Sequence, residues 1–81
     1  MELTNERREG FSKELIQWIS EVKDPTDAEC KEWIEGKGLE WVGKVRFGEC
    51  WILGMNWLDE GIAIEALWNP KDNQNALLRY R

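Results

Sequence analysis

The spacing of apolar residues changes once along this chain, near Leu39, and this change constrains the fold more than any other feature. Before Leu39, apolar side chains recur every three or four residues, which is the period of an amphipathic helix. After Leu39 they recur every two residues, which is the period of a half-buried strand. The pattern predicts an α+β fold in which two N-terminal helices pack on one face of a three- to four-stranded antiparallel β-meander.

The helices are predicted over residues 5–23 and about 26–35. Pro25 separates them, because proline disfavours helical geometry in the residue before it and suits the first turn of a new helix. Thr26 and Glu29 match a capping box, in which each side chain bonds to the backbone N–H of the other residue. The residues expected on the buried helix faces are Phe11, Leu15, Trp18, Ile19, Val22, Cys30, Trp33 and Ile34.

Three strands are predicted over residues 39–47, 50–57 and 62–69, with a weaker fourth near 75–80. The connections between them are too short for crossover helices, so neighbouring strands are expected to be antiparallel. The length of the chain and the lack of any repeat or linker predict one domain over residues 1–81.

The chain contains six tryptophans and no histidine. A buried aromatic side chain removes roughly 150 to 250 Å² of surface from water, so several indoles give a short chain a large hydrophobic driving force. We therefore expect the tryptophans to build the core.

The environment of Trp51 and Trp57 depends on the turn that follows Phe47. A three-residue turn places Phe47 opposite Trp51 and puts both tryptophans on the apolar face under the helices. A two-residue turn, which suits the Gly-X sequence at this point, places Arg46 opposite Trp51. Trp51 and Trp57 would then form an aromatic surface on a charged face, where a cationic ligand or a partner could use them. We favour the three-residue turn because the hydrophobic pattern determines the register where one face is buried.

The second turn is expected to contain four residues, 58–61, which places Trp57 opposite Ile62 and Trp51 opposite Trp68. With the three-residue first turn, the outer face of the sheet has mixed polarity and an apolar centre. Its residues would be Val42, Lys44, Arg46, Ile52, Gly54, Asn56, Glu65 and Leu67.

The chain carries 11 basic and 16 acidic residues, a net charge of −5, and the excess of acids lies in residues 1–35. Direct nucleic-acid binding is disfavoured, because it draws its affinity from Lys and Arg at the phosphates. A basic protein surface is the expected partner. The acidic patch predicted to contact it comprises Glu21, Asp24, Asp27, Glu29, Glu32 and Glu35.

The chain lacks the residues of common catalytic and metal sites. Without histidine it has no ordinary general base near neutral pH and no Ser-His or Cys-His pair. Cys30 and Cys50 form no CxxC motif, and one helix rarely supplies the about six to eight oxygen ligands that Ca²⁺ takes. We expect no enzyme activity, no metal and no cofactor.

The N-terminal residues lack the apolar run of a signal peptide, and no segment approaches the roughly 18 to 20 apolar residues of a membrane span. The expectation is a cytoplasmic protein that is not bound to a membrane.

The leading hypothesis is a non-enzymatic protein-binding module. It would be a small acidic regulator or inhibitor that docks on a basic surface of a larger protein, for example one that handles nucleic acid. The alternative is a small-ligand binding domain with a Trp-lined aromatic pocket at Trp51 and Trp57. A homodimer through the outer sheet face or an edge strand is a further alternative, because the chain is short and that face is partly apolar.

Overall fold

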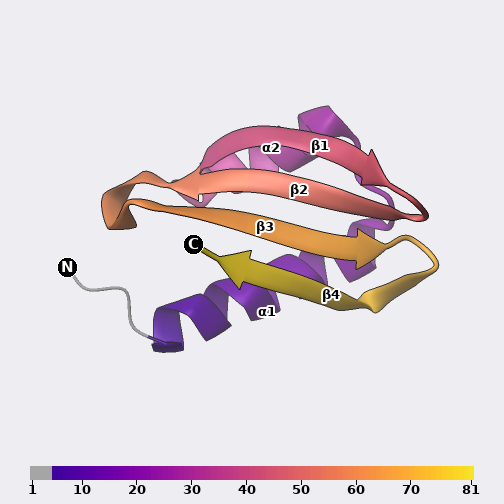
Figure 1. The fold of residues 1–81 in the computed structure, drawn as a ribbon, viewed down its shortest axis with the longest axis horizontal. Helices are drawn as coiled ribbons and strands as arrows, with labels where there is room; N and C mark the ends of the chain where they lie inside the picture. The colour runs from indigo at the N-terminus through magenta and orange to yellow at the C-terminus, as the bar shows by residue number, and fades with distance from the viewer. Residues whose placement is uncertain (1–4) are drawn as a thin grey trace.

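The computed structural model describes the backbone of residues 5–81 and the side chains of residues 6–72 and 76–81. Two helices precede one four-stranded antiparallel sheet with the strand order β1-β2-β3-β4. Both helices lie on the same side of the sheet, and the other side is uncovered (Figure 1). The predicted α+β arrangement is confirmed. The elements are α1 (Asn5–Val22), α2 (Asp27–Gly36), β1 (Glu40–Phe47), β2 (Cys50–Trp57), the 3₁₀ turn η1 (Leu58–Glu60), β3 (Ile62–Asn69) and β4 (Asp72–Tyr80).

The start of α2 has the predicted capping box. The Thr26 hydroxyl accepts a hydrogen bond from the Glu29 backbone N–H at 3.1 Å, and the Thr26 N–H donates to Glu29 Oε1 at 2.9 Å. These bonds satisfy two backbone donors that the first turn of a helix would otherwise leave unpaired. Pro25 is buried directly before the cap and anchors the connection between the helices.

The core lies between the helices and the inner face of the sheet. Leu15 and Ile19 of α1 are fully buried, as is Ile34 of α2, because helical spacing of three and four residues aligns them toward the strands. Tyr80 ties the end of β4 to α1, since its hydroxyl donates to the Arg8 carbonyl at 2.8 Å and lies 2.8 Å from the Ser12 hydroxyl. The buried strand residues are Leu53, Met55, Trp57, Ile64, Ala66, Trp68 and Ala76.

The first hairpin differs from the favoured prediction. Its turn contains two residues, so Phe47 pairs with Cys50 and Arg46 pairs with Trp51. The three-residue turn is therefore wrong. Gly48 has a φ of 63°, a left-handed conformation that glycine adopts without steric cost, and it allows the short turn to close.

A two-residue turn was expected to expose Trp51 and Trp57 of β2, but in the structure it does not. They stay on the helix-covered face, and Lys44 and Arg46 of β1 join them there, because directly paired residues share a face. Val45 therefore projects from the outer face, which corrects the predicted outer set in which Lys44 and Arg46 pointed outward. A β-bulge between Trp41 and Gly43 shifts the register again, so that Trp41 pairs with Met55 on the inner face.

The second hairpin follows the prediction. Trp57 pairs with Ile62 and Trp51 pairs with Trp68, across a connection formed by η1 and Gly61. Gly61 has a φ of 67° and ends this turn in the left-handed conformation. The last strand, β4, begins earlier than expected, because the tight turn after Asn69 pairs that residue directly with Asp72.

Candidate functional site

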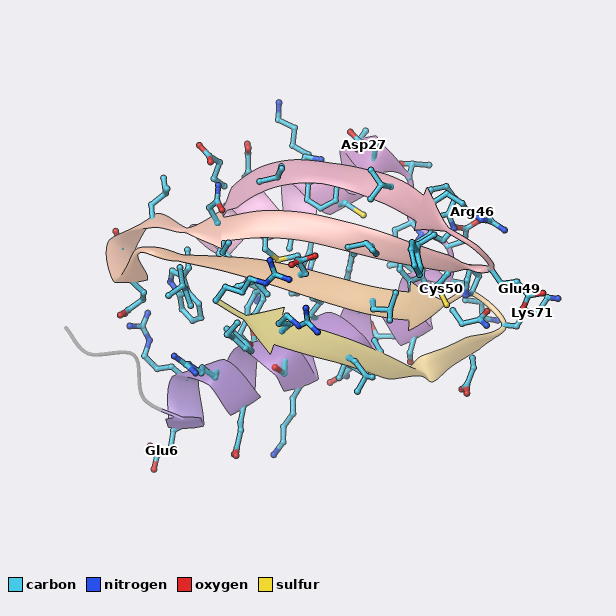
Figure 2. All side chains as sticks on the ribbon, in the orientation of Figure 1. Glu6, Asp27, Arg46, Glu49, Cys50 and Lys71 are labelled. Atoms are coloured by element: carbon cyan, nitrogen blue, oxygen red, sulfur yellow. The ribbon has the colours of Figure 1, made fainter. Side chains whose placement is uncertain are left out.

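All six residues of the predicted acidic patch are exposed, and they lie along α2, its connection to α1 and the last turns of α1. Three of them also stabilise the fold. Asp24 pairs with Lys44 at 3.3 Å, and Asp27, at the start of α2 (Figure 2), accepts a hydrogen bond from the Trp41 indole N–H at 3.2 Å. Glu29 belongs to the capping box. Part of the patch therefore stabilises the fold. Only part of the patch borders a concave surface.

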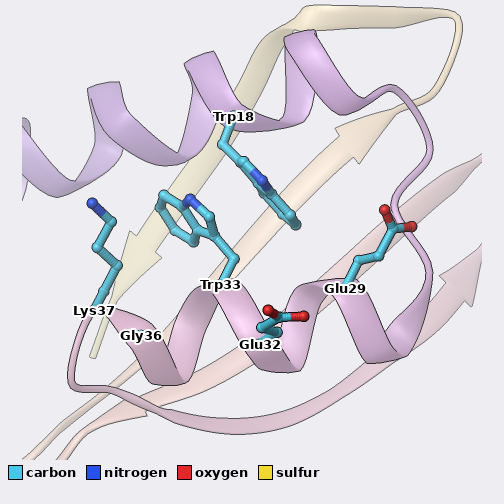
Figure 3. Close-up of a pocket in the computed structure, with 6 residues that line it drawn as sticks. All are labelled: Trp18, Glu29, Glu32, Trp33, Gly36 and Lys37. Carbon is cyan, nitrogen blue, oxygen red and sulfur yellow. The ribbon is translucent and has the colours of Figure 1, made fainter.

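That concave surface is a shallow groove of about 500 Å³ between the two helices. Its floor is an indole pair: Trp18 of α1 stacks on Trp33 of α2, with ring centroids 5.0 Å apart and an interplanar angle of 17°. Glu29 and Glu32 border the rings on one side, and Lys37 stands at the opposite end (Figure 3). We call these residues, with Gly36, the Trp18–Trp33 groove.

Both tryptophans of the groove are half-buried, although the helical pattern predicted that they would face the core. The sequence contains a signal for this position. Each tryptophan directly precedes a fully buried isoleucine, Ile19 in α1 and Ile34 in α2. Successive residues in a helix differ by about 100°, so each indole lies at the margin of its apolar stripe, where it reaches solvent.

Lys37 shows that the groove accepts a cation over an indole ring. Its ammonium nitrogen lies 5.2 Å from the centroid of Trp33 and pairs with Glu14 at 3.2 Å. This contact occupies only the Lys37 end of the groove, while the carboxylates of Glu29 and Glu32 border the other end.

Trp51 and Trp57 do not form an open aromatic surface. Trp57 is buried, with its ring 5.6 Å from that of Phe11, and the Arg7 guanidinium, which pairs with Glu60, lies over it. A cation–π site for a ligand needs an accessible ring face. The face of Trp57 is occupied by groups of the same chain.

Trp51 is half-buried and also has internal partners. It stacks on Trp68 at 6.4 Å, and the ammonium of Lys44 lies 4.2 Å from its ring centroid. The Arg46 guanidinium lies 5.0 Å from the same ring. Lys44 further donates to the Pro25 carbonyl at 2.6 Å, so both cations belong to the packing of the hairpin end.

The outer face of the sheet is the second candidate surface. Of the six large hydrophobic side chains that are exposed among the described residues, five lie on this face and only Leu58 lies elsewhere. Val42 belongs to it because a Cβ placed on the outward side of Gly54 would be 3.4 Å from the Val42 Cβ. The five are Val42, Val45, Phe47, Leu67 and Leu77.

The two cysteines differ in how deeply they are buried. Cys30 is fully buried, and burial raises the pKa of its thiol to about 11, so the neutral thiol predominates at physiological pH. Cys50 lies at the start of β2 beside the first turn, near Glu49 and Arg46 (Figure 2). Within the part of the chain that the structure describes, no cluster of His, Cys, Asp and Glu side chains could hold a metal ion.

The described helices include none that is both long and apolar enough to cross a membrane. The features that stand out are therefore two surfaces on opposite sides of the sheet: an acidic helical side with the Trp18–Trp33 groove, and an apolar outer sheet face. Comparisons of the chain with protein-family models, with curated proteins and with solved structures found no match.

Proposed function

We propose that this protein is a non-enzymatic binding module that docks its acidic helical side on a basic surface of another protein. The observation that carries the proposal is the Trp18–Trp33 groove, where two stacked and half-exposed indoles lie beside the carboxylates of Glu29 and Glu32. Acidic residues on a helix are ordinary surface features by themselves. An adjacent exposed aromatic pair gives the patch a centre that can contribute binding energy.

The chemistry of the groove suits an arginine side chain from the partner. A guanidinium is planar, stacks on indole faces and forms paired hydrogen bonds with carboxylates. An arginine at the end of the groove away from Lys37 would contact the exposed parts of the Trp18–Trp33 pair and reach the carboxylates that border it. Such a contact is partly desolvated, so it is stronger than an exposed ion pair of the same charges.

The charge distribution supports approach from the helical side. Residues 1–35 hold ten acids and five bases, which accounts for the whole net charge of −5, and two acids of α2, Glu29 and Glu32, border the groove. Negative potential around an aromatic centre accelerates encounter with basic surfaces. Grooves that bind nucleic acid are basic, so the proposed partner class includes proteins that handle nucleic acid, with this protein as a competing regulator or inhibitor. The proposed location is the cytoplasm, where the two free cysteines stay reduced.

The test is a titration with a short arginine-rich peptide, followed by intrinsic tryptophan fluorescence and by calorimetry at about 0.15 M salt, where the Debye length is about 8 Å. We expect Glu32→Lys and Trp33→Leu each to weaken binding at least about tenfold. The matched control is Glu9→Lys, which changes the net charge equally on an exposed α1 residue that does not line the groove.

Equal loss of affinity in Glu9→Lys and Glu32→Lys would mean that only net charge matters, and the groove would have no role. Absence of binding by the unmodified protein would also overturn the proposal. Circular dichroism of each variant separates loss of binding from loss of fold.

A further inference from the structure

Four apolar residues form one continuous row across the outer sheet face. Val45 pairs with Ile52, Ile52 pairs with Leu67, and Leu67 pairs with Leu77, so the row crosses all four strands. Directly paired residues on one face of a sheet have side chains in contact range. Phe47 and three members of the row, Ile52, Leu67 and Leu77, border a groove of about 540 Å³.

The exposure of this row is unusual for a surface. Within the row Val45 is 58 % exposed and Leu77 69 %, and Phe47 beside the row is 67 % exposed. Scattered apolar residues are normal on monomers, but a contiguous apolar strip across a sheet marks an interaction surface.

Four charged side chains of this face balance one another, in contrast to those of the helical side. Glu65 pairs with Arg79 across the strands and lies 3.1 Å from the Arg81 guanidinium. Glu40 accepts a hydrogen bond from Asn56 at 2.8 Å. Two acids and two bases give these four ionised groups no net charge. Two copies can therefore bring these parts of their sheet faces together without repulsion, whereas their acidic helical sides would repel each other.

The outer sheet face is also large enough to form a dimer interface. Four strands of about eight residues, at about 3.4 Å per residue and 4.8 Å between strands, cover roughly 500 Å². Packing two such faces would remove roughly 1,000 Å² in total, which is about the minimum for a specific interface. A chain of 81 residues has a small core, and oligomerisation is a common source of extra burial at this size.

From these observations we infer that the outer sheet face is a homodimer interface, in which the row Val45–Ile52–Leu67–Leu77 of one copy packs against the same row of a second copy. The contact is isologous, with a two-fold axis through the sheet face. The two sheets form a sandwich about 10 Å apart, and the helices lie on its two outer sides. The Trp18–Trp33 groove remains accessible in this arrangement, so the inference is independent of the proposed function.

The experiment is sedimentation velocity of the whole chain over a dilution series from roughly 1 µM to 0.5 mM, the range in which an interface of this size is expected to dissociate. We expect a concentration-dependent dimer. Leu77→Glu should raise the dissociation constant at least about tenfold. The matched control is Leu58→Glu, which places the same charge at a leucine of similar exposure, 64 %, in η1 and off the sheet face.

Sedimentation of the unmodified chain is already decisive, because a monomer at every concentration overturns the inference. Equal effects of Leu77→Glu and Leu58→Glu also overturn it, as does a dimer that Glu32→Lys disrupts and Leu77→Glu does not. Val45→Glu replaces Leu77→Glu if that variant fails to fold. Because Glu32→Lys should leave the dimer intact, failure of the dimer and failure of the proposed groove are distinguishable.

Discussion

The two faces of the sheet are built from the same strands, but they differ in how completely their side chains are partnered. On the inner face even a cation is accommodated, because Lys44 contacts the Pro25 carbonyl, Asp24 and the ring of Trp51. On the outer face the next residue, Val45, is mostly exposed. Lys44 thus has its partners within the chain, whereas the apolar side chains of the outer face are exposed to solvent.

The difference between the two faces is tested most directly by shortening one leucine on each face. Leu53→Ala removes a fully buried side chain and should lower the free energy of unfolding by about 2–5 kcal/mol. Leu77→Ala, on the outer face, should change it by less than about 0.5 kcal/mol at a concentration where the protein is monomeric. Urea unfolding followed by tryptophan fluorescence measures both. Similar losses would show that the outer face belongs to the monomer's own core.

A second prediction concerns the pH dependence of stability and the buried thiol. The pKa of Cys30 rises from 9.0 to about 11 on folding because burial disfavours the thiolate. Above about pH 9 the unfolded chain loses this proton while the native protein retains it. Stability is therefore full below about pH 9 and falls by about 2–3 kcal/mol as the pH approaches 11.

Burial also raises the pKa of Tyr80 above its ordinary value of 10.0, so its contribution has the same sign and is lost above about pH 10. Urea unfolding at a series of pH values should show a shallower alkaline slope in Cys30→Ala than in the unmodified protein. The control is Cys50→Ala, which removes the other, less buried thiol. An unchanged slope in Cys30→Ala would contradict the assignment to this thiol.

The smallest change in the free energy of unfolding is expected from substitution of Lys44 on the inner face. Lys44→Ala removes a hydrogen bond to the Pro25 carbonyl and an ion pair to Asp24, and should lower the free energy of unfolding by about 1–2 kcal/mol. The control Lys37→Ala removes a more exposed ion pair, to Glu14, and should cost at most about 1 kcal/mol. Thermal unfolding of both variants decides whether Lys44 is a structural part of the inner face. A smaller loss in Lys44→Ala than in Lys37→Ala would argue that it is not.

Much of the fold was predictable because its signals are local. The capping box of Thr26 and Glu29 joins residues three apart, and the pairing of Trp57 with Ile62 follows from a short loop with matching patterns on both sides. All six residues of the acidic patch are exposed, five of them on the helices and Asp24 in their connection. The stacking of Trp18 on Trp33 was not predicted, since it depends on how two helices pack against each other.

The sequence by itself determined the order of helices and strands, the inner face of β2 and β3, and the separation of an acidic half from a balanced half. The tertiary structure decided the register of β1, because there two local signals disagreed: the short turn at Gly48 and the alternation of apolar residues. The short turn is compatible with the fold because Lys44, on the inner face, meets a carbonyl of the interhelical connection and the ring of Trp51. These partners offset the cost of taking a cation out of water, and they come together only when the helices lie on the sheet.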